Sequence, residues 1–274
     1  KLIGLMPVRN EAWCLGLTLR AALQRCDAVV VLLHACTDES ERIAYQIADE
    51  CERVKLLHVM GEWDEMVHRQ YMLEMARGEG ATHIAIVDAD EILTGCELPS
   101  IKMDVLSTPH GCCLQLPLYN LRGSLDRYHS NGIWGNRWLS VAFKDDPQLS
   151  WTGDRFHARE PEYPRGRKLR PYQPIKHGQS GVMHLWGVSE RRLAAKHALY
   201  KGTERLRWPG RSLREIEDMY NLWRSPEDCA MTYPHMPEWG KPWTYADVPA
   251  EWWTPYKGFI KQTEIDYSIR GDGS

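Results

Sequence analysis

The stretch HIAIVDADEIL, residues 83–93, decides the fold of this chain. Its first half, His83 to Val87, is a short apolar run of the kind that forms a strand buried on both faces of a parallel sheet. The run ends in Asp88-Ala89-Asp90 and is followed at once by Glu91. Buried carboxylates cost free energy unless they are paired or bind a metal ion, so these acids indicate a site at the end of the strand.

Two interpretations of the acids are open at this point. In an extended segment, Asp88 and Asp90 point to the same side of the chain. Two carboxylates at the carboxyl end of a parallel strand can hold a divalent cation in the crevice where open α/β sheets bind ligands. The alternative is an exposed acidic turn, because an Asp-x-Asp pattern by itself is a weak signal. The remaining motifs of the chain favour the metal site.

The composition indicates a globular protein without a membrane span. The 274 residues are 43% hydrophobic and 26% charged, enough for one large α/β domain with an elaborated end or for two small domains. No apolar run reaches the roughly 18 residues of a membrane span, and no signal-peptide pattern opens the sequence. The 8 cysteines include no CxxC pair, which predicts reduced, partly buried thiols in a cytoplasmic protein.

The net charge of −3 conceals a strongly basic middle segment. Residues 155–214 have a charge balance of +11, whereas residues 1–154 and 215–274 have balances of −8 and −6. A basic block between acidic flanks predicts an anionic partner. The alternative is a solvated basic face that balances the acidic flanks within the fold.

The first 95 residues alternate between strands and helices. Apolar strands are expected at 2–6, 28–33, 54–59 and 83–87, with a helix between each pair and a turn beginning at Pro7. This alternation predicts a right-handed, mostly parallel α/β sheet flanked by helices.

After Leu93 the alternation fades. Strands are expected at 111–119 and 138–144, and residues 145–183 are expected to form loops over the carboxyl edge of the sheet. Ser189 can cap a helix that runs to about residue 206. The chain is thus predicted to consist of two halves of one domain, 1–110 and 111–230, and an irregular Trp- and Pro-rich extension at 231–274 that wraps along the body.

Three stretches in this order resemble family-two glycosyltransferases of the GT-A fold. They are PVRNEA at 7–12, AVVVLLHACTDES at 28–40 and GATHIAIVDADEIL at 80–93. In that family the first turn reads PxxNE, the second strand ends in Asp before a short polar turn, and a DxD motif closes the first half. A later stretch, VMHLWGVSERRLAAKHALYK at 182–201, resembles the His-aromatic-Ser block of one branch, which ends in a lysine. Each motif is weak, but together, in order and in register, they are specific.

The resemblance implies a Rossmann-like GT-A domain whose first half binds a nucleoside diphosphate sugar, with a UDP-sugar expected first. It implies Mn²⁺ or Mg²⁺ on the diphosphate and transfer of a hexose or pentose, with inversion, to a hydroxyl bound by the second half. Asp90 matches the direct metal ligand, and His184 matches a later histidine that can complete the metal shell. The expected donor-binding residues are Pro7, Asn10, Glu11, Asp38, Arg69 and Asp88. Arg69 matches a basic position that faces the diphosphate or pairs with the first Asp.

The second strand departs from the family pattern at Leu33-His34. The family usually carries there an Asp that holds the uracil. Either Glu11 and Asp38 do this work, or the donor base is not uracil.

Transfer needs a carboxylate that takes the proton of the acceptor hydroxyl. Asp154 is the expected base and Glu160 the reserve, with a plain surface acid as the alternative for each. The expected acceptor contacts are Trp151, Arg155 and Trp186, although core packing is the default for any one tryptophan. The basic block favours a polyanionic acceptor, with a hydroxyl-bearing modified base in DNA ahead of a phosphate-bearing glycan or lipid.

Two other classes of protein remain open. A nucleotidyltransferase of related α/β fold would also place an acidic pair on a metal, but its Gly-rich phosphate loop is missing, since PVRNEA contains no glycine. A non-catalytic nucleic-acid-binding module would account for the basic block and leave the acids at 88–91 unexplained.

Overall fold

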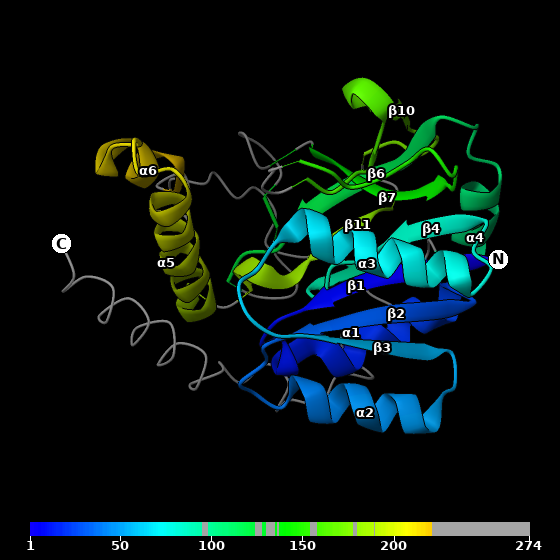
Figure 1. The fold of residues 1–274 in the computed structure, drawn as a ribbon, viewed down its shortest axis with the longest axis horizontal. Coiled ribbons are helices and arrows are strands. Elements are labelled where there is room, and N and C mark those ends of the chain that lie inside the picture. Colours follow the sequence, from blue (N-terminus) through cyan, green and yellow to red (C-terminus); the bar gives the residue numbers. More distant parts are fainter. Residues whose placement is uncertain are drawn as a thin grey trace.

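The computed structural model describes residues 1–94, 98–123, 128–129, 135, 137–153, 158–177, 180–188 and 190–220. The extension expected at 231–274 lies outside these residues, as do Asp154 and Arg155. The described chain forms a mixed sheet with helices against both faces (Figure 1). The α/β class expected from the sequence is therefore confirmed.

The first half of the sheet consists of parallel strands joined by helices. Its elements are β1 (Leu2–Val8), α1 (Ala12–Arg25), β2 (Ala28–His34), α2 (Ser40–Glu50), β3 (Val54–Val59), α3 (Glu65–Gly78) and β4 (His83–Ile86). The strand order is β3-β2-β1-β4. Strand β1 continues through Pro7, which pairs with Leu32, so the turn expected to begin at Pro7 begins only after Val8.

The second half extends the same sheet in the order β4-β7-β6-β11-β5, with β10 also paired to β6. Its elements are β5 (Glu91–Leu93), α4 (Leu98–Leu106), β6 (Cys112–Asn120), β7 (Arg137–Lys144), β10 (Arg170–Tyr172) and β11 (Val182–His184). Because β7 is antiparallel to both β4 and β6, β4 and β6 run in the same direction. The ends of β1, β2, β4, β6 and β11 therefore meet at one edge, called here the carboxyl edge.

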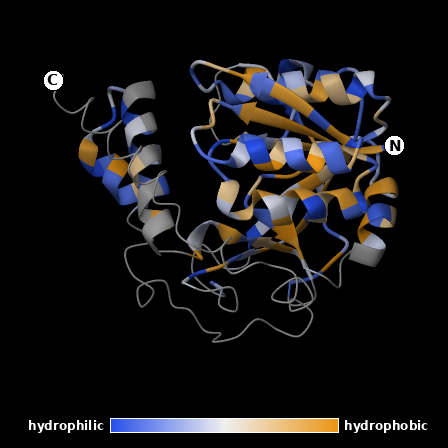
Figure 2. Ribbon diagram, turned by 90° about the horizontal axis from the view of Figure 1, so that it is seen from below, coloured by the Kyte–Doolittle hydropathy of each residue, from blue (hydrophilic) through white to orange (hydrophobic). Residues whose placement is uncertain are grey.

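The alternation of side chains along β1 divides the core between the two faces of the sheet. Leu2 and Met6 pack on one face with α1, α2 and α4, whereas Ile3 and Leu5 pack on the other face with α3. Figure 2 shows the helices with mixed hydropathy, as expected for elements that bury one side and expose the other.

A basic hairpin lies at the opposite end of the sheet from the carboxyl edge. It is formed by β8 (Glu162–Tyr163), the 3₁₀ turn η3 (Pro164–Gly166) and β9 (Arg167–Lys168), and it leads into β10. Strand β10 pairs with the beginning of β6, whereas β11 pairs with its end. The prediction that residues 145–183 cover the carboxyl edge is thus wrong for 162–172. On the side of β6 that faces away from β7, β11 pairs with the carboxyl half of β6, so β10 completes the backbone hydrogen bonds of the amino half.

Beyond the carboxyl edge, a short turn η4 (Leu185–Gly187) leads into α5 (Glu190–Arg207), which is followed by α6 (Leu213–Tyr220). Figure 1 shows both helices at the side of the sheet where the strands end. No helix in the described ranges has the length and apolar character needed to cross a membrane.

Candidate functional site

The turns after β1 and β2 are held together by side-chain hydrogen bonds. Asn10 Nδ2 donates to Thr37 Oγ1 over 3.0 Å, and Thr37 N donates to Asn10 Oδ1 over 2.8 Å. The carboxylate of Asp38 accepts from the backbone N–H groups of Ala12 and Ser40 at 3.0 and 2.8 Å. Asn10 has a φ of 55°, a left-handed conformation that Asn tolerates better than most residues. Asn10 and Asp38 therefore fix the shape of these two turns, called here the rim of the site. Direct contact of the two residues with a donor stays a prediction.

The acids at 88–91 form a turn between β4 and β5 rather than an extended strand end. Glu91 N donates to Asp88 O over 3.1 Å, which closes the turn. The expectation that Asp88 and Asp90 share one side of an extended segment is thus wrong. The turn directs the two carboxylates to different partners, since Asp88 pairs with arginines and Asp90 with a lysine and a histidine.

Asp88 lies between two arginines. Arg69 Nη2 of α3 is 3.3 Å from Asp88 Oδ1, and Arg159 Nη1 is 2.7 Å from Asp88 Oδ2. Burial by itself would raise the pKa of Asp88, but the charges of Arg159 and Arg69 outweigh it and lower that pKa. Arg69 thus pairs with the first Asp, which is one of the two roles that the sequence suggested for it.

Arg159 also neutralises Glu91 with a two-pronged hydrogen bond. Its Nη1 donates to Glu91 Oε1 over 2.8 Å and its Nη2 to Oε2 over 2.6 Å. Burial raises the pKa of Glu91, and the Arg159 charge opposes that shift. Arg159 therefore fastens the segment at 158–160 to the acidic turn.

Asp90 and His184 form a pair at the ends of two different strands. Asp90 is only 5% exposed, and His184 Nε2 is 3.7 Å from Asp90 Oδ2. His184 Nδ1 donates to Asn120 Oδ1 over 3.0 Å, so Nε2 is the ring nitrogen on the side of Asp90. The ring of Trp186 stacks on His184 with centroids 5.2 Å apart and thus fixes the imidazole orientation.

The pair fits a divalent cation. A carboxylate oxygen and an imidazole nitrogen each lie about 2.1 Å from a bound ion, so they are about 3.0 to 4.2 Å apart for angles from 90° to 180°. The observed separation of 3.7 Å falls in this range. In the described part of the chain, no group of three or more His, Cys, Asp or Glu side chains is arranged to hold a metal. Such two-ligand sites are typical of ions that take their other ligands from substrate phosphates and water.

The ammonium group of Lys196 contacts Asp90, one member of this pair. Lys196 Nζ of α5 donates to Asp90 Oδ2 and lies 3.4 Å from Glu11 Oε1. Glu11 also accepts from Trp13 Nε1 over 2.7 Å. Lys196 thus joins the turn after β1, the acidic turn and α5 at one point, with only 8% of the lysine exposed.

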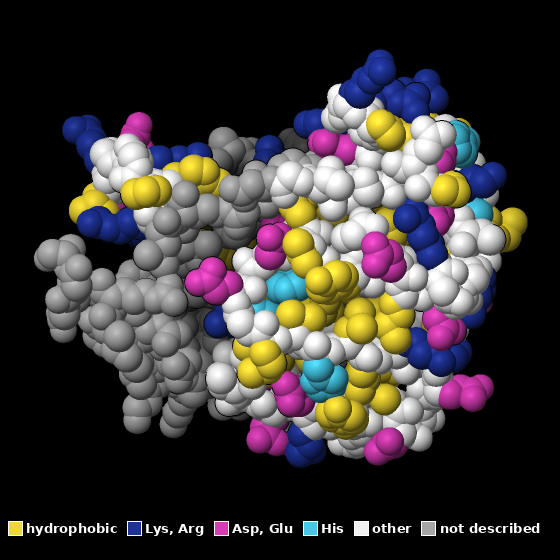
Figure 3. Space-filling model, in the orientation of Figure 1, with side chains coloured by type: hydrophobic (Ala, Val, Ile, Leu, Met, Phe, Trp, Pro, Cys, Tyr) yellow, Lys and Arg dark blue, Asp and Glu magenta, His cyan; other side chains and the backbone are white. Residues whose placement is uncertain are grey.

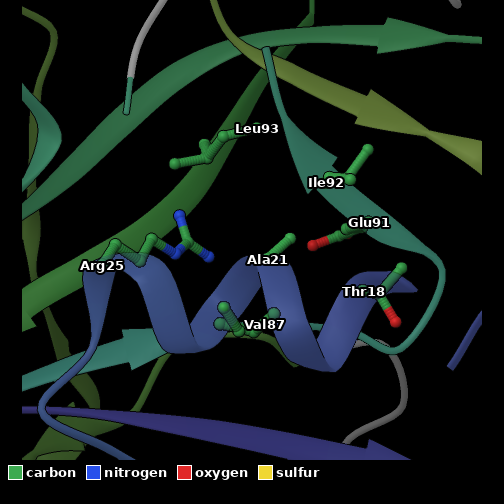
Figure 4. Close-up of a pocket in the computed structure, with 8 residues that line it drawn as sticks. Thr18, Ala21, Arg25, Val87, Glu91, Ile92 and Leu93 are labelled. Atoms are coloured by element: carbon green, nitrogen blue, oxygen red, sulfur yellow. The ribbon is translucent and has the colours of Figure 1, made fainter. Parts of the chain in front are cut away.

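A small cavity lies behind the acidic turn, between α1 and β5 (Figure 4). Thr18 and Arg25 line it from α1, and Glu91 and Leu93 from β5. Its volume of about 10 Å³ is close to the space that one water needs. This cavity is therefore too small for a nucleotide.

His34 occupies the strand end where the family pattern has an Asp. It is fully buried, and its Nε2 is 3.0 Å from Gly61 O. Its ring contacts Trp63 and His68 at centroid distances of 5.1 and 5.2 Å. Burial and the nearby Arg9 charge lower the pKa of His34 to about 4. His34 is thus a neutral core residue that cannot replace an Asp as a base-binding acceptor at the surface.

The expected acceptor and base residues have mixed outcomes. Trp151 is 2% exposed, packs against Phe143 and donates to Ala158 O over 3.1 Å, so the expectation that it stacks on an acceptor is wrong. Trp186 is 7% exposed and stacks on His184, which places it beside the site as a packing residue and not as an open stacking surface. Glu160 accepts a hydrogen bond from Ser140, and its role as a base stays a prediction.

Several described cations of the basic block pair with carboxylates, whereas a group of four around one hairpin does not. Arg159, Lys196, Lys201 and Arg211 each pair with a carboxylate. Four exposed cations that lie close together in the sequence have no ion pair to a described carboxylate; they are Arg165, Arg167, Lys168 and Arg170, called here the basic patch. Figure 3 shows Lys and Arg side chains gathered in the region of β10. Along β6, the partners of Arg170 and His184 are eight positions apart, which corresponds to about 26 Å.

Sequence reasoning missed Asn120 and Arg159 as site residues. Arg159 carried only the general signal of the basic block, and Asn120 carried none, because its role depends on β6 lying beside β11. Lys196 did lie in the quoted 182–201 motif, seven residues after Ser189, but the sequence suggested it only as one of the cations that face an anionic acceptor.

No model of a protein family matches the chain, and no curated protein matches it either. Solved structures that it matches include S. aureus TarS 1-349 in complex with UDP, at 14% identity and a TM-score of 0.35, covering 53% of this chain and 46% of that chain. Glucosyl-3-phosphoglycerate synthase from Mycobacterium tuberculosis, in complex with Mn²⁺, UDP and phosphoglyceric acid, matches at 15% identity and a TM-score of 0.33, covering 44% and 43%. The mannosyltransferase PcManGT from Pyrobaculum calidifontis, in complex with GDP-Man and Mn²⁺, matches at 18% identity and a TM-score of 0.33, covering 52% and 44%.

Each of these matches spans less than half of the neighbouring chain. The neighbours include a named mannosyltransferase and a named glucosyl synthase, the kind of enzyme that the motifs resemble. With TM-scores below 0.5, however, the likeness carries no part of the functional argument, which rests on the arrangement of the site residues.

Proposed function

We propose that this protein is a metal-dependent glycosyltransferase that moves a sugar from a nucleoside diphosphate sugar to an acceptor hydroxyl. The observation that carries the proposal is the Asp90–His184 pair with Asn120 behind the imidazole, at the carboxyl edge of the sheet. This edge is where open α/β sheets bind nucleotides. The pair lies beside the turns that match the donor-binding motifs, because Lys196 contacts both Asp90 and Glu11.

The chain's own residues prepare this edge for an anionic donor. Asp90 and His184 would hold Mn²⁺ or Mg²⁺, which stabilises negative charge on the leaving diphosphate. Arg69 and Arg159 neutralise Asp88, so that carboxylate does not repel the donor. Asn120 keeps His184 in the tautomer that presents its lone pair. A UDP-sugar is the first expectation for the donor, and a cytoplasmic location belongs to the same proposal.

The direct test is calorimetric titration with UDP and GDP in the presence and absence of Mn²⁺. We expect one nucleotide to bind only when Mn²⁺ is present. The Asp90→Asn variant should lose this binding, whereas Asp49→Asn, on the exposed side of α2, should retain it. Absence of nucleotide binding with Mn²⁺ present, or full sugar transfer in EDTA, would refute the assignment. DNA binding in a protein that binds no nucleotide would instead support a nucleic-acid-binding module.

For the acceptor, we propose a polyanion. DNA with a hydroxyl-bearing modified base is the first choice, and a phosphate-bearing glycan or lipid is the second. The basic patch supports this, because four exposed cations in six residues repel one another unless an anion lies near. Its distance of about 26 Å from His184 favours a long acceptor that reaches from the patch to the carboxyl edge. Proton removal is assigned to Asp154, or to Glu160 in its place.

A further inference from the structure

Lys196 lies where it must interfere with the proposed cation. Its ammonium group donates to Asp90 Oδ2, the same oxygen that lies 3.7 Å from His184 Nε2. Glu11 Oε1, at 3.4 Å from Nζ, adds a second negative charge on the other side of the lysine. The contact joins residues 106 positions apart and is buried, so a positively charged group lies against the metal ligand inside the protein.

Two positive groups cannot both lie against one carboxylate oxygen at low cost. Repulsion between charges a few ångströms apart is strong where water is largely excluded, and Lys196 and Asp90 are only 8% and 5% exposed. A lysine side chain has a flexible four-carbon stem, so its ammonium group can move while α5 stays in place. Binding of a divalent ion at Asp90 therefore requires Lys196 to leave the Oδ2 atom.

We propose that Lys196 is a built-in counter-cation of Asp90 that the divalent ion displaces and that then serves the donor diphosphate. The inference rests on the proposed function. In the metal-free protein, Lys196 neutralises Asp90 and keeps α5 against the acidic turn. When the ion takes Asp90, the lysine keeps Glu11 within reach and becomes available to a phosphate oxygen at the same rim.

This exchange predicts that metal and nucleotide bind cooperatively. The ion alone must displace Lys196 without giving it a new anionic partner, so its affinity is low. With a nucleoside diphosphate present, the displaced lysine gains a phosphate partner, and by linkage each ligand strengthens the binding of the other. Removal of Lys196 should abolish the part of this coupling that comes from the lysine. The part that comes from direct contact between metal and phosphate should remain.

The first experiment is calorimetric titration of Mn²⁺, without nucleotide, into the wild type and the Lys196→Gln variant. We expect the variant to bind Mn²⁺ at least about tenfold more tightly, as removal of one neighbouring positive charge implies. In the variant, UDP should enhance Mn²⁺ affinity by a smaller factor than in the wild type. The matched control is Lys201→Gln, on the same helix and paired with Glu217, which should behave as the wild type. Unchanged or weaker Mn²⁺ binding by Lys196→Gln would overturn the proposal.

A second experiment uses the wild type and so does not depend on the folding of a variant. Brief acetylation with an amine-reactive ester, mapped by mass spectrometry, should modify Lys196 slowly in the metal-free protein and at least about fivefold faster with saturating Mn²⁺, because the ammonium group no longer lies against Asp90. Lys201 is the internal reference for reagent strength. Equal labelling of Lys196 with and without bound Mn²⁺ would contradict the exchange. Failure of any nucleotide to bind with Mn²⁺ would refute the proposed function separately.

Discussion

At the scale of single residues, Arg159 controls the electrostatics of the acidic turn. It is the common partner of Asp88 and Glu91, and its Nη2 also donates to Ile86 O over 3.1 Å. Removal of Arg159 is costly because the Glu91 carboxylate, only 7% exposed, would remain buried without its counter-charge. We predict that Arg159→Ala lowers the free energy of unfolding by about 3–5 kcal/mol in urea denaturation.

The matched control for this variant is Arg165→Ala. Arg165 is exposed and has no ion pair with a described carboxylate, so its removal should change the free energy of unfolding by less than about 0.5 kcal/mol. Adding Glu91→Gln to Arg159→Ala should recover part of the loss, since it removes one of the uncompensated charges. A loss below about 1 kcal/mol for Arg159→Ala would contradict this account of the turn.

His34 predicts a pH dependence of stability. Its pKa is about 4 in the folded protein, below the ordinary value of about 6.5 that it regains on unfolding. The unfolded state therefore binds more protons between these values, so the contribution of His34 is fully present above pH 6.5 and is lost as the pH falls toward 4. When the pH is lowered from 7.5 to 5, His34 alone should lower the free energy of unfolding by about 2 kcal/mol. The measurement is urea denaturation at both pH values. The His34→Gln variant should lose less stability than the wild type. The control is His58→Gln, at a more exposed histidine, which should lose the same amount as the wild type.

At the scale of secondary-structure elements, the position of β11 depends on a glycine. A Cβ atom on Gly181 would lie 2.1 Å from Pro117 O and 2.8 Å from Tyr119 Cε2, both in β6. Gly181→Ala must therefore push β11 away from β6 and move His184 relative to Asn120. We predict a loss of about 2 kcal/mol or more in the free energy of unfolding and at least about tenfold weaker Mn²⁺ binding.

The control for this element is Gly78→Ala at the end of α3. A Cβ atom there meets nothing within 4 Å, so the substitution should stabilise the helix by about 0.5–1 kcal/mol and leave Mn²⁺ binding unchanged. If Gly181→Ala retained both stability and Mn²⁺ affinity, the close contact between β11 and β6 would not be what positions His184. Urea denaturation and calorimetry measure both quantities.

At the scale of the whole molecule, the basic patch and the carboxyl edge lie at opposite ends of the sheet. A long phosphate polymer that contacts the four cations of the patch would release counterions on binding. For duplex DNA, we predict an affinity that falls about a hundredfold between 50 and 200 mM salt. Replacing Arg165, Lys168 and Arg170 with Gln should flatten this salt dependence without changing binding of a nucleoside diphosphate with Mn²⁺.

The comparison variant replaces Lys201 and Arg214, cations of α5 and α6 that pair with Glu217 and Asp218. Their removal changes the total charge but not the patch, so the salt dependence should stay as in the wild type. Filter binding or fluorescence anisotropy at several salt concentrations gives the slope. No affinity for DNA at low ionic strength would exclude a DNA acceptor, and the patch would then be a solvated surface.

Three features could be predicted from the sequence, namely the α/β class, the four parallel strands of the first half and the position of the acids after a strand. Hydrophobic runs and their spacing are local properties, and a buried parallel strand such as β2 needs apolar residues on both faces wherever it lies. The same local reasoning proposed Asp90 and His184 as a pair from motif order, and the structure brings them to 3.7 Å.

The contacts of these residues, by contrast, depend on the tertiary structure. The sequence could not reveal that Asn120 orients His184, that Arg159 neutralises the acidic turn or that Lys196 lies against Asp90, because these contacts join residues 64, 71 and 106 positions apart. It also misjudged Trp151 and the basic segment at 162–172, because exposure and location depend on which strand completes the hydrogen bonds of β6. Local patterns determine which elements form, whereas sheet order and packing determine which of their side chains meet.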